Sequence, residues 1–237
     1  MSCSPRRRAR RSLPRRPETA LVAGLLHSVS ATSLGVLAGR PHYGLAVSDF
    51  VRARAPHTPG TRLAVMYPPF ALPGEGPGEA RTASVLVINP IPAKGSELLH
   101  WLLWLMPEQH FTLVEGWWAT AAEFAVYPNV TYVPRVYDMG PLYRSHRVLL
   151  VPSTVEDAFP RVIAEAALHG VPSIGTDRGG IPEAIGDAGI VLPSTVGPET
   201  WASAIREADH EALGMRARCE AVTFTRPCQP ELRKLGV

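Results

Sequence analysis

The chain has 237 residues, of which 46% are hydrophobic, and its formal net charge is +3. It contains no uninterrupted run of about 18 apolar residues, which argues against a membrane-spanning segment. Its three cysteines lie far from metal-ligand spacing, which indicates a reducing compartment and neither a structural disulfide nor a metal site.

The N-terminal segment, residues 1–18, is strongly basic. Seven arginines fall within the first sixteen positions, so the rest of the chain is mildly acidic. Such a tail is usually disordered and can bind nucleic acid or anionic lipid nonspecifically. The mildly apolar stretch 20–38 makes an export signal an alternative, but His27 interrupts it and no clean cleavage site follows. We expect a cytoplasmic protein without a nucleic-acid partner; peripheral attachment to the inner face of the membrane stays open.

Residues 19–70 predict a small N-terminal unit, of which the segment 43–70 contains a strand, a helix and an exit towards the next domain. The stretch 68–81 is rich in proline and glycine, and it predicts an interdomain linker over 71–81. A complete two-domain enzyme would need about 100–200 residues in each domain, so this first unit is only a remnant.

Strands and helices alternate over residues 82–213, a pattern typical of a doubly wound α/β domain with a parallel sheet. Trp101 and Trp104 lie at helical spacing and are expected in the core. Residues 214–237 are expected to form a C-terminal tail. The predicted strands are 84–90, 110–115, 129–133, 147–151, 171–175 and 189–192, and the predicted helices are 96–106, 138–144, 160–170, 181–185 and 198–208.

The start of the helix after strand 147–151 predicts a phosphate-binding site. Its first residues would present free backbone N–H groups at the carboxyl end of the sheet, where doubly wound proteins bind phosphates. The helix stops at Gly170, and His169 beside it is expected to act as a C-terminal cap. The residues of this helix start are Phe159, Pro160, Arg161 and Val162.

Two carboxylates flank the same helix start. Asp157 precedes it, where an N-terminal cap is the alternative to a ligand contact. Glu165 lies eight residues later within an otherwise apolar helix, so it should be half buried. A half-buried acid normally has a specific hydrogen-bond donor, and a ribose diol would be such a donor.

Residues 152–193 resemble the donor-binding signature of retaining glycosyltransferases with the two-domain GT-B fold, known as group 1 or family 4. These enzymes carry a Glu-x7-Glu motif followed by Gly-Val-Pro and Gly-Gly-x-Pro-Glu. The resemblance implies that Glu165 binds the ribose and that Asp157 contacts the transferred sugar. Asp157 stands where the pattern has glutamate and is one methylene shorter.

The resemblance extends upstream to the loop after strand 84–90. It implies that Lys94 neutralises the departing diphosphate, although a solvated loop lysine is the alternative. The Gly-Arg of the pattern is replaced by Asn89 and Pro90, so one cation is missing. Gly179 and Gly180 predict either a tight turn or a close approach of the backbone to the donor.

We therefore expect the donor-binding half of a glycosyltransferase, with a remnant of its acceptor domain. It would move a sugar from a nucleoside diphosphate sugar to an unidentified hydroxyl acceptor with retention of configuration. Lys94 and Asp157 would serve catalysis, and no metal or other cofactor would be required. A catalytically silent nucleotide-sugar-binding module or truncated subunit is the main alternative.

A third hypothesis is an unrelated doubly wound protein, such as an epimerase or a response-regulator-like domain. An epimerase would need a Gly-x-Gly-x-x-Gly turn after its first strand, and the chain has none. A Walker loop and a Gly-x-Ser-x-Gly elbow are also absent from the sequence. This excludes a P-loop protein and a hydrolase of the Gly-x-Ser-x-Gly type.

Overall fold

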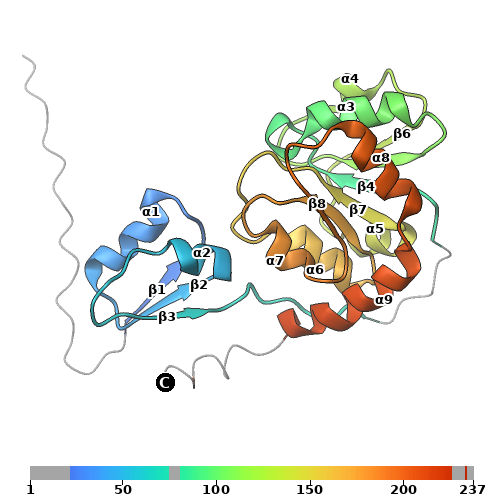
Figure 1. Cartoon of the computed structure of the whole chain (residues 1–237). Helices are drawn as coiled ribbons and strands as arrows, with labels where there is room; N and C mark the ends of the chain where they lie inside the picture. The colour runs from blue at the N-terminus through green and yellow to red at the C-terminus, as the bar shows by residue number, and fades with distance from the viewer. Residues whose placement is uncertain (1–21, 75–80, 226–232, 234–237) are drawn as a thin grey trace, which may run out of the picture.

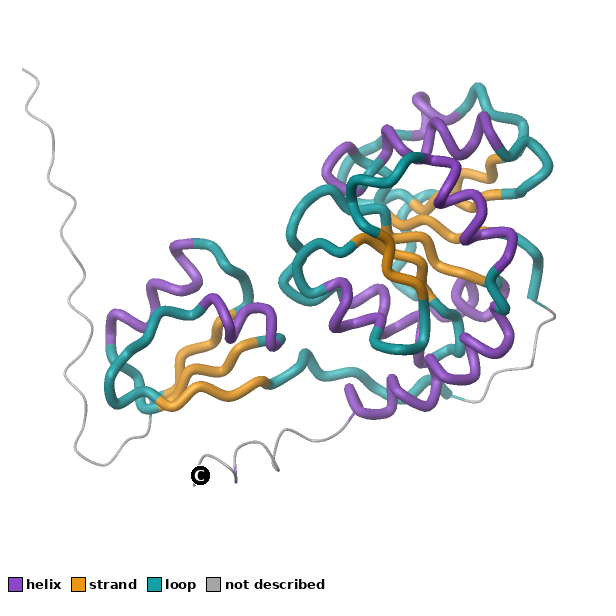
Figure 2. The backbone as a smooth tube through the Cα atoms, viewed as in Figure 1, coloured by secondary structure: helices purple, strands orange, loops and turns teal. Residues whose placement is uncertain are grey.

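The computed structural model describes residues 22–74, 81–225 and 233, and these form a small and a larger lobe (Figure 1). An extended segment leads from the last strand of the small lobe to the larger one, as the teal tube of Figure 2 shows. Among the described helices, none is both long and apolar enough to cross a membrane.

The small lobe is a three-stranded parallel sheet in the order β1-β2-β3. Its core contains Leu26, Leu37, Ala46 and Val51, which are at most 1% exposed. The six elements of this lobe are β1 (Ala23–Leu26), α1 (Ala31–Leu34), the 3-10 helix η1 (Gly35–Gly39), β2 (Tyr43–Ala46), α2 (Asp49–Arg54) and β3 (Arg62–Val65).

The larger lobe contains a six-stranded sheet whose strands all pair in parallel, in the order β6-β5-β4-β7-β8-β9. The chain fills one edge with β5 and β6, then returns to the middle and fills the other edge with β8 and β9. The strands are β4 (Val85–Ile88), β5 (Phe111–Val114), β6 (Val130–Val133), β7 (Val148–Val151), β8 (Ser173–Thr176) and β9 (Ile190–Leu192).

Helices cover both faces of this sheet, with α3 and α8 on one face and α6, α7 and α9 on the other (Figure 1). Val85 and Val87 of β4 pack towards the first group, and Leu86 between them packs towards the second. The helices are α3 (Ser96–Leu105), α4 (Ala121–Phe124), α5 (Gly140–Ser145), α6 (Arg161–Leu168), α7 (Ile181–Ile185), α8 (Pro198–Glu207) and α9 (His210–Ala221), with the 3-10 helices η2 (Pro92–Lys94) and η3 (Val222–Thr225).

The structure confirms the doubly wound parallel sheet, and each predicted strand of the larger lobe is present within a few residues of its expected bounds. His169 is the C-terminal cap of α6, as expected, and its Nδ1 lies 2.9 Å from the Glu165 carbonyl oxygen. Residues 214–221, expected in a C-terminal tail, form most of α9, which packs on α6. Of the predicted linker, residues 75–80 lie outside the described part.

The prediction for two tryptophans of α3 was wrong. Trp101 and Trp104 are 59% and 70% exposed, and their rings contact each other edge to face. The buried stripe of α3 consists of Leu99, Leu102 and Leu103. Because leucine and tryptophan alternate around this helix, periodicity alone did not identify the side that faces the sheet.

Candidate functional site

The candidate site lies where the strand order of the larger sheet reverses, between β4 and β7. In doubly wound folds, the carboxyl ends of the strands at such a point form a crevice. A cavity of about 370 Å³ occupies this position, lined by residues that follow β4, β5 and β7. Its polar lining includes Asn89, Lys94, Asp157 and Arg161.

Lys94 and Asp157 form an ion pair in the wall of this cavity. The Lys94 Nζ atom lies 2.5 and 2.6 Å from the two Asp157 carboxylate oxygens, and the two side chains are only 29% and 21% exposed. Lys94 is therefore not a solvated loop lysine. Asp157 does not cap α6 either, since the residue at the N-cap position is Pro160 and no described side chain caps this helix.

The loop that carries Lys94 lies tightly against the end of β7. Gly95 has φ +83°, and a β-carbon there would come within 2.1 Å of the Pro152 carbonyl oxygen. The Thr154 N–H and the Ser153 hydroxyl both donate to the Ala93 carbonyl oxygen. These contacts hold two segments about 60 residues apart in the chain, and so bring Lys94 to Asp157.

The first turn of α6 lines the same cavity through Pro160, Arg161 and Val162, so the positive end of the helix dipole faces the crevice. Phe159 precedes this turn, and its ring is buried against Tyr67 and Phe70 of the segment that joins the lobes. The Phe159 side chain thus belongs to the core, and the residue also lines the cavity.

Glu165 lies in a neighbouring hollow of about 530 Å³, not in the cavity with Asp157. The Tyr143 hydroxyl donates to Glu165 Oε2 at 3.1 Å, and Arg161 Nη2 lies 3.3 Å from Oε1. Burial, then the charge and hydrogen bond of Glu165, raise the pKa of Tyr143, so the phenol stays protonated and donates. The half-buried Glu165 therefore has protein donors, one of which, Tyr143, the sequence analysis did not identify.

Arg161 lies between the two hollows, because it lines both of them. Its guanidinium lies 4.7 Å from the centre of the Phe70 ring and forms the ion pair with Glu165. Arg161 therefore stands between the predicted diphosphate site at Lys94 and the predicted ribose site at Glu165.

The two glycines after β8 are required by packing against the loop that carries Asp157. A β-carbon at Gly179, which has φ +61°, would come within 2.4 Å of the Asp157 carbonyl oxygen, and one at Gly180 within 2.4 Å of that of Ala158. The Gly180 N–H donates to the Asp157 carbonyl at 2.6 Å. Neither glycine lines the cavity, so their contact with a donor stays a prediction.

Asn89 takes a place in the cavity wall at the end of β4. It has φ +57°, a conformation that asparagine tolerates better than most residues. Its side-chain Oδ1 is buried without a hydrogen-bond partner among the described residues, and a β-carbon at Gly116 would lie 2.0 Å from it. Asn89 thus places an uncharged side chain in the cavity wall, where Asn89 and Pro90 stand in place of the Gly-Arg of the pattern.

Residues 106–209 match the family model described as "Glycosyl transferases group 1". Three solved structures share the fold at identities below 25%. HepE of Anabaena, solved with UDP and glucose, has a TM-score of 0.71 and 21% identity over 90% of this chain and 71% of its own. Sucrose-phosphate synthase of Thermosynechococcus elongatus has a TM-score of 0.68 and 19% identity over 90% and 66%.

TarM of S. aureus has a TM-score of 0.68 and 15% identity, over 84% of this chain and 43% of its own. The chain therefore spans less than half the length of TarM and about two thirds of the synthase. No curated protein matches the sequence. These likenesses establish the Rossmann-like α/β fold expected from the sequence.

Proposed function

We propose that the chain binds a nucleoside diphosphate sugar at the β4–β7 crevice and transfers the sugar to a hydroxyl acceptor with retention of configuration. The observation that carries this proposal is the Lys94–Asp157 pair in the cavity that the first turn of α6 also lines. A cation, a helix N-terminus and a carboxylate at one crevice match the needs of a diphosphate joined to a polyol. The match of residues 106–209 to a glycosyltransferase family and the UDP-bound likeness support it.

The diphosphate would occupy the 370 Å³ cavity. Lys94 would exchange one or both of its hydrogen bonds to Asp157 for phosphate oxygens, while α6 and Arg161 add positive potential. These preorganised groups stabilise the charge that develops on the departing diphosphate, and they do so without a metal ion. Asp157, once released, accepts a hydrogen bond from a hydroxyl of the transferred sugar.

The nucleoside would extend into the neighbouring hollow, where Glu165 accepts the ribose hydroxyls. A carboxylate offers about four lone-pair directions, and two of those of Glu165 are used by Tyr143 and Arg161. The remaining acceptor capacity suits a diol. The proposal thus assigns the two hollows to the two ends of one ligand, with Arg161 between them.

In the transfer itself, the bond between the anomeric carbon and the phosphate oxygen breaks, and its electron pair goes to the phosphate. The acceptor oxygen then bonds to the anomeric carbon on the same face, and its proton passes to the departing phosphate oxygen. No protein carboxylate acts as nucleophile in this scheme, so Asp157 only positions the sugar.

A catalytically silent nucleotide-sugar-binding module is the second candidate, and the uncharged Asn89 in the cavity wall favours it. Fewer cations at the leaving group would slow departure more than they weaken binding.

One pair of measurements separates these functions. Isothermal titration with UDP, GDP and ADP and their glucose and mannose conjugates should show binding of at least one of them. NMR of the donor during incubation should then show its slow hydrolysis, with an α-configured sugar released first from an α-linked donor. Binding without turnover supports the silent module, and the absence of binding to any of these nucleotides would refute both.

A further inference from the structure

Glu183, in the first turn of α7, reaches from the larger lobe to the small one. Its Oε1 accepts hydrogen bonds from the Asp49 N–H and the Tyr67 hydroxyl, both at 2.8 Å, and its Oε2 accepts one from the Phe50 N–H at 3.0 Å. Asp49 and Phe50 begin α2, and Tyr67 belongs to the segment that leaves β3. One carboxylate thus binds both the start of α2 and the segment by which the chain leaves the small lobe.

The first backbone N–H groups of α2 find their hydrogen-bond acceptors in both lobes. Its own N-cap, Ser48, accepts a hydrogen bond from the Val51 N–H at 3.1 Å. The N–H groups of Asp49 and Phe50, which precede it, donate hydrogen bonds to the Glu183 carboxylate. Because the first N–H groups of a helix have no partner within the helix, Glu183 completes a cap that the small lobe does not supply.

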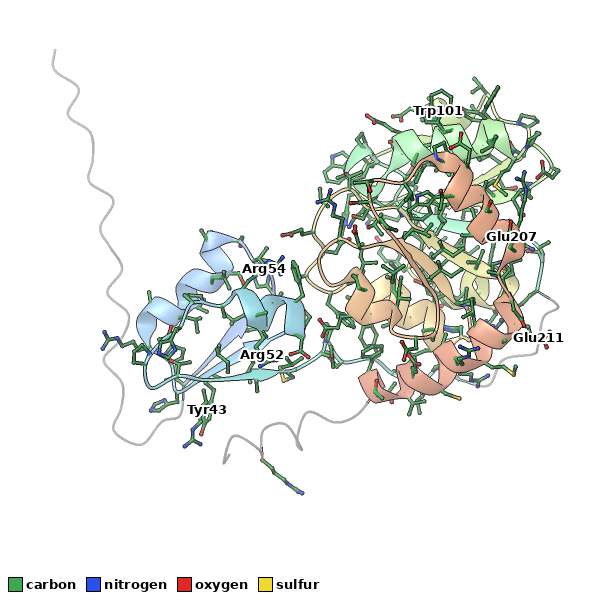
Figure 3. The ribbon with its side chains drawn as sticks, viewed as in Figure 1. Tyr43, Arg52, Arg54, Trp101, Glu207 and Glu211 are labelled. Carbon is green, nitrogen blue, oxygen red and sulfur yellow. The ribbon has the colours of Figure 1, made fainter. Side chains whose placement is uncertain are left out.

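The same helix also contacts the loop that carries Asp157. The Ser48 hydroxyl, fully buried, donates to the Ala158 carbonyl oxygen at 2.5 Å. The Arg54 guanidinium lies 3.2 Å from the Glu156 carboxylate, on the side of the small lobe that faces the larger one (Figure 3). The neighbours of Asp157 on both sides are therefore tied to α2.

A carboxylate is the group that this position requires. Two adjacent N–H groups and one hydroxyl need three acceptor sites from a single side chain, and a carboxylate has two oxygens and no donor. Glutamine has the same shape but would turn an NH2 group towards one of these donors. The pKa of Tyr67 is raised by burial and then by its bond to Glu183, so its phenol remains the donor.

We propose that Glu183 is a positioning residue that fixes the small lobe against the loop of Asp157 and so holds the sugar-binding carboxylate in place. This inference rests on the proposed function for its effect on turnover, whereas the geometry it assigns to the lobes can be tested without any ligand. The groups proposed to bind the diphosphate and ribose all belong to the larger lobe. Loss of Glu183 should therefore spare nucleotide binding and impair transfer.

The first test measures the distance between the lobes by pulsed electron–electron double resonance. Spin labels would be attached at Ala38→Cys in the small lobe and Ser203→Cys on α8, both at exposed positions. The unchanged chain should give one narrow distance distribution, and Glu183→Gln a clearly broader one. The background would carry serine in place of Cys3, Cys219 and Cys228.

Glu207→Gln, at an exposed position on α8 (Figure 3), is the matched control and should leave the distribution narrow. Tyr67→Phe removes one of the three hydrogen bonds and should broaden it less than Glu183→Gln. A narrow distribution in Glu183→Gln would overturn the inference, whatever the activity of the protein. The weaker Tyr67→Phe variant keeps the test decisive if Glu183→Gln fails to fold.

The second test compares binding with turnover. In Glu183→Gln, the Kd for UDP should stay within about twofold of that of the unchanged chain, while kcat for donor hydrolysis falls at least tenfold. Equal losses in both would contradict a positioning role. If the unchanged chain binds no nucleotide, the proposed function fails, and the lobe distances still decide the role of Glu183.

Discussion

The Gly179–Gly180 turn allows a sharp test of how Asp157 is placed, because three glycines of the larger lobe differ in one feature at a time. Gly179 combines φ +61° with a β-carbon position 2.4 Å from the Asp157 carbonyl oxygen. Gly180 has φ −87° and only the overlap, 2.4 Å from the Ala158 carbonyl oxygen. Gly197 has φ −77°, and its added β-carbon would meet only the flexible end of Glu199.

These differences set the expected losses of stability on substitution by alanine. At Gly180, an added methyl must push the neighbouring backbone away, and such overpacking costs about 1–3 kcal/mol. At Gly179, the left-handed conformation adds about 1–2 kcal/mol for a residue with a β-carbon, so the loss should total about 2–5 kcal/mol. At Gly197, a surface position without backbone overlap, the change should stay within about 0.5 kcal/mol.

Urea unfolding followed by circular dichroism and tryptophan fluorescence would measure these losses, since Trp201 is buried in the larger lobe. We expect the order Gly179→Ala, Gly180→Ala, Gly197→Ala from most to least destabilised. If Gly180→Ala unfolded at the urea concentration of the unchanged chain, the close contact between this turn and the loop of Asp157 would be refuted. The two glycines would then have no part in positioning Asp157.

Three further predictions concern charge. Lys94→Gln should weaken UDP binding by about tenfold to a hundredfold in isothermal titration, the worth of one charge-assisted hydrogen bond, whereas Arg206→Gln, on the exposed surface, should leave the Kd unchanged. Treatment with EDTA should leave donor hydrolysis unchanged, and a lost activity restored by Mg²⁺ would contradict the metal-free scheme. Burial lowers the pKa of His146, so as the pH falls below about 6.5 the unfolded chain takes up a proton that the folded chain does not, and the free energy of unfolding should decrease. In urea unfolding experiments between pH 7.5 and 5, the free energy of unfolding should decrease less for His146→Gln than for the unchanged chain. The control His57→Gln, at an exposed position, should show the same decrease as the unchanged chain.

The fold of the larger lobe was predictable because its signals are local. The strands β4 and β7 are short apolar runs, and β7 is buried along its whole length, as continuous hydrophobicity indicates. The meeting of Lys94 and Asp157 followed from topology, since both come after strands that are neighbours in the sheet. A parallel arrangement brings such loops to one edge, whatever their separation in sequence.

Contacts made by single side chains across elements were not predictable in the same way. Tyr143 donates to Glu165 from another helix, and no periodic pattern marks a tyrosine as the partner of a given carboxylate. Glu183 was visible in the sequence only as the end of a motif, whereas its partners lie 116 to 134 positions away in the small lobe. Only the packed arrangement of the two lobes shows what that glutamate holds.

The Lys94–Asp157 pair also bears on how the crevice would accept the ligand of the proposed function. Each charge satisfies the other, so neither stands unpaired in a half-buried wall. A partly exposed ion pair contributes little net stability, about 0–1 kcal/mol, so its exchange for diphosphate costs little. Diphosphate offers Lys94 more negative charge than one carboxylate does, and binding would release Asp157 at the moment when a sugar hydroxyl arrives. Under the proposed function, a ligand that brings both an anion and a hydroxyl donor would therefore satisfy both members of the pair.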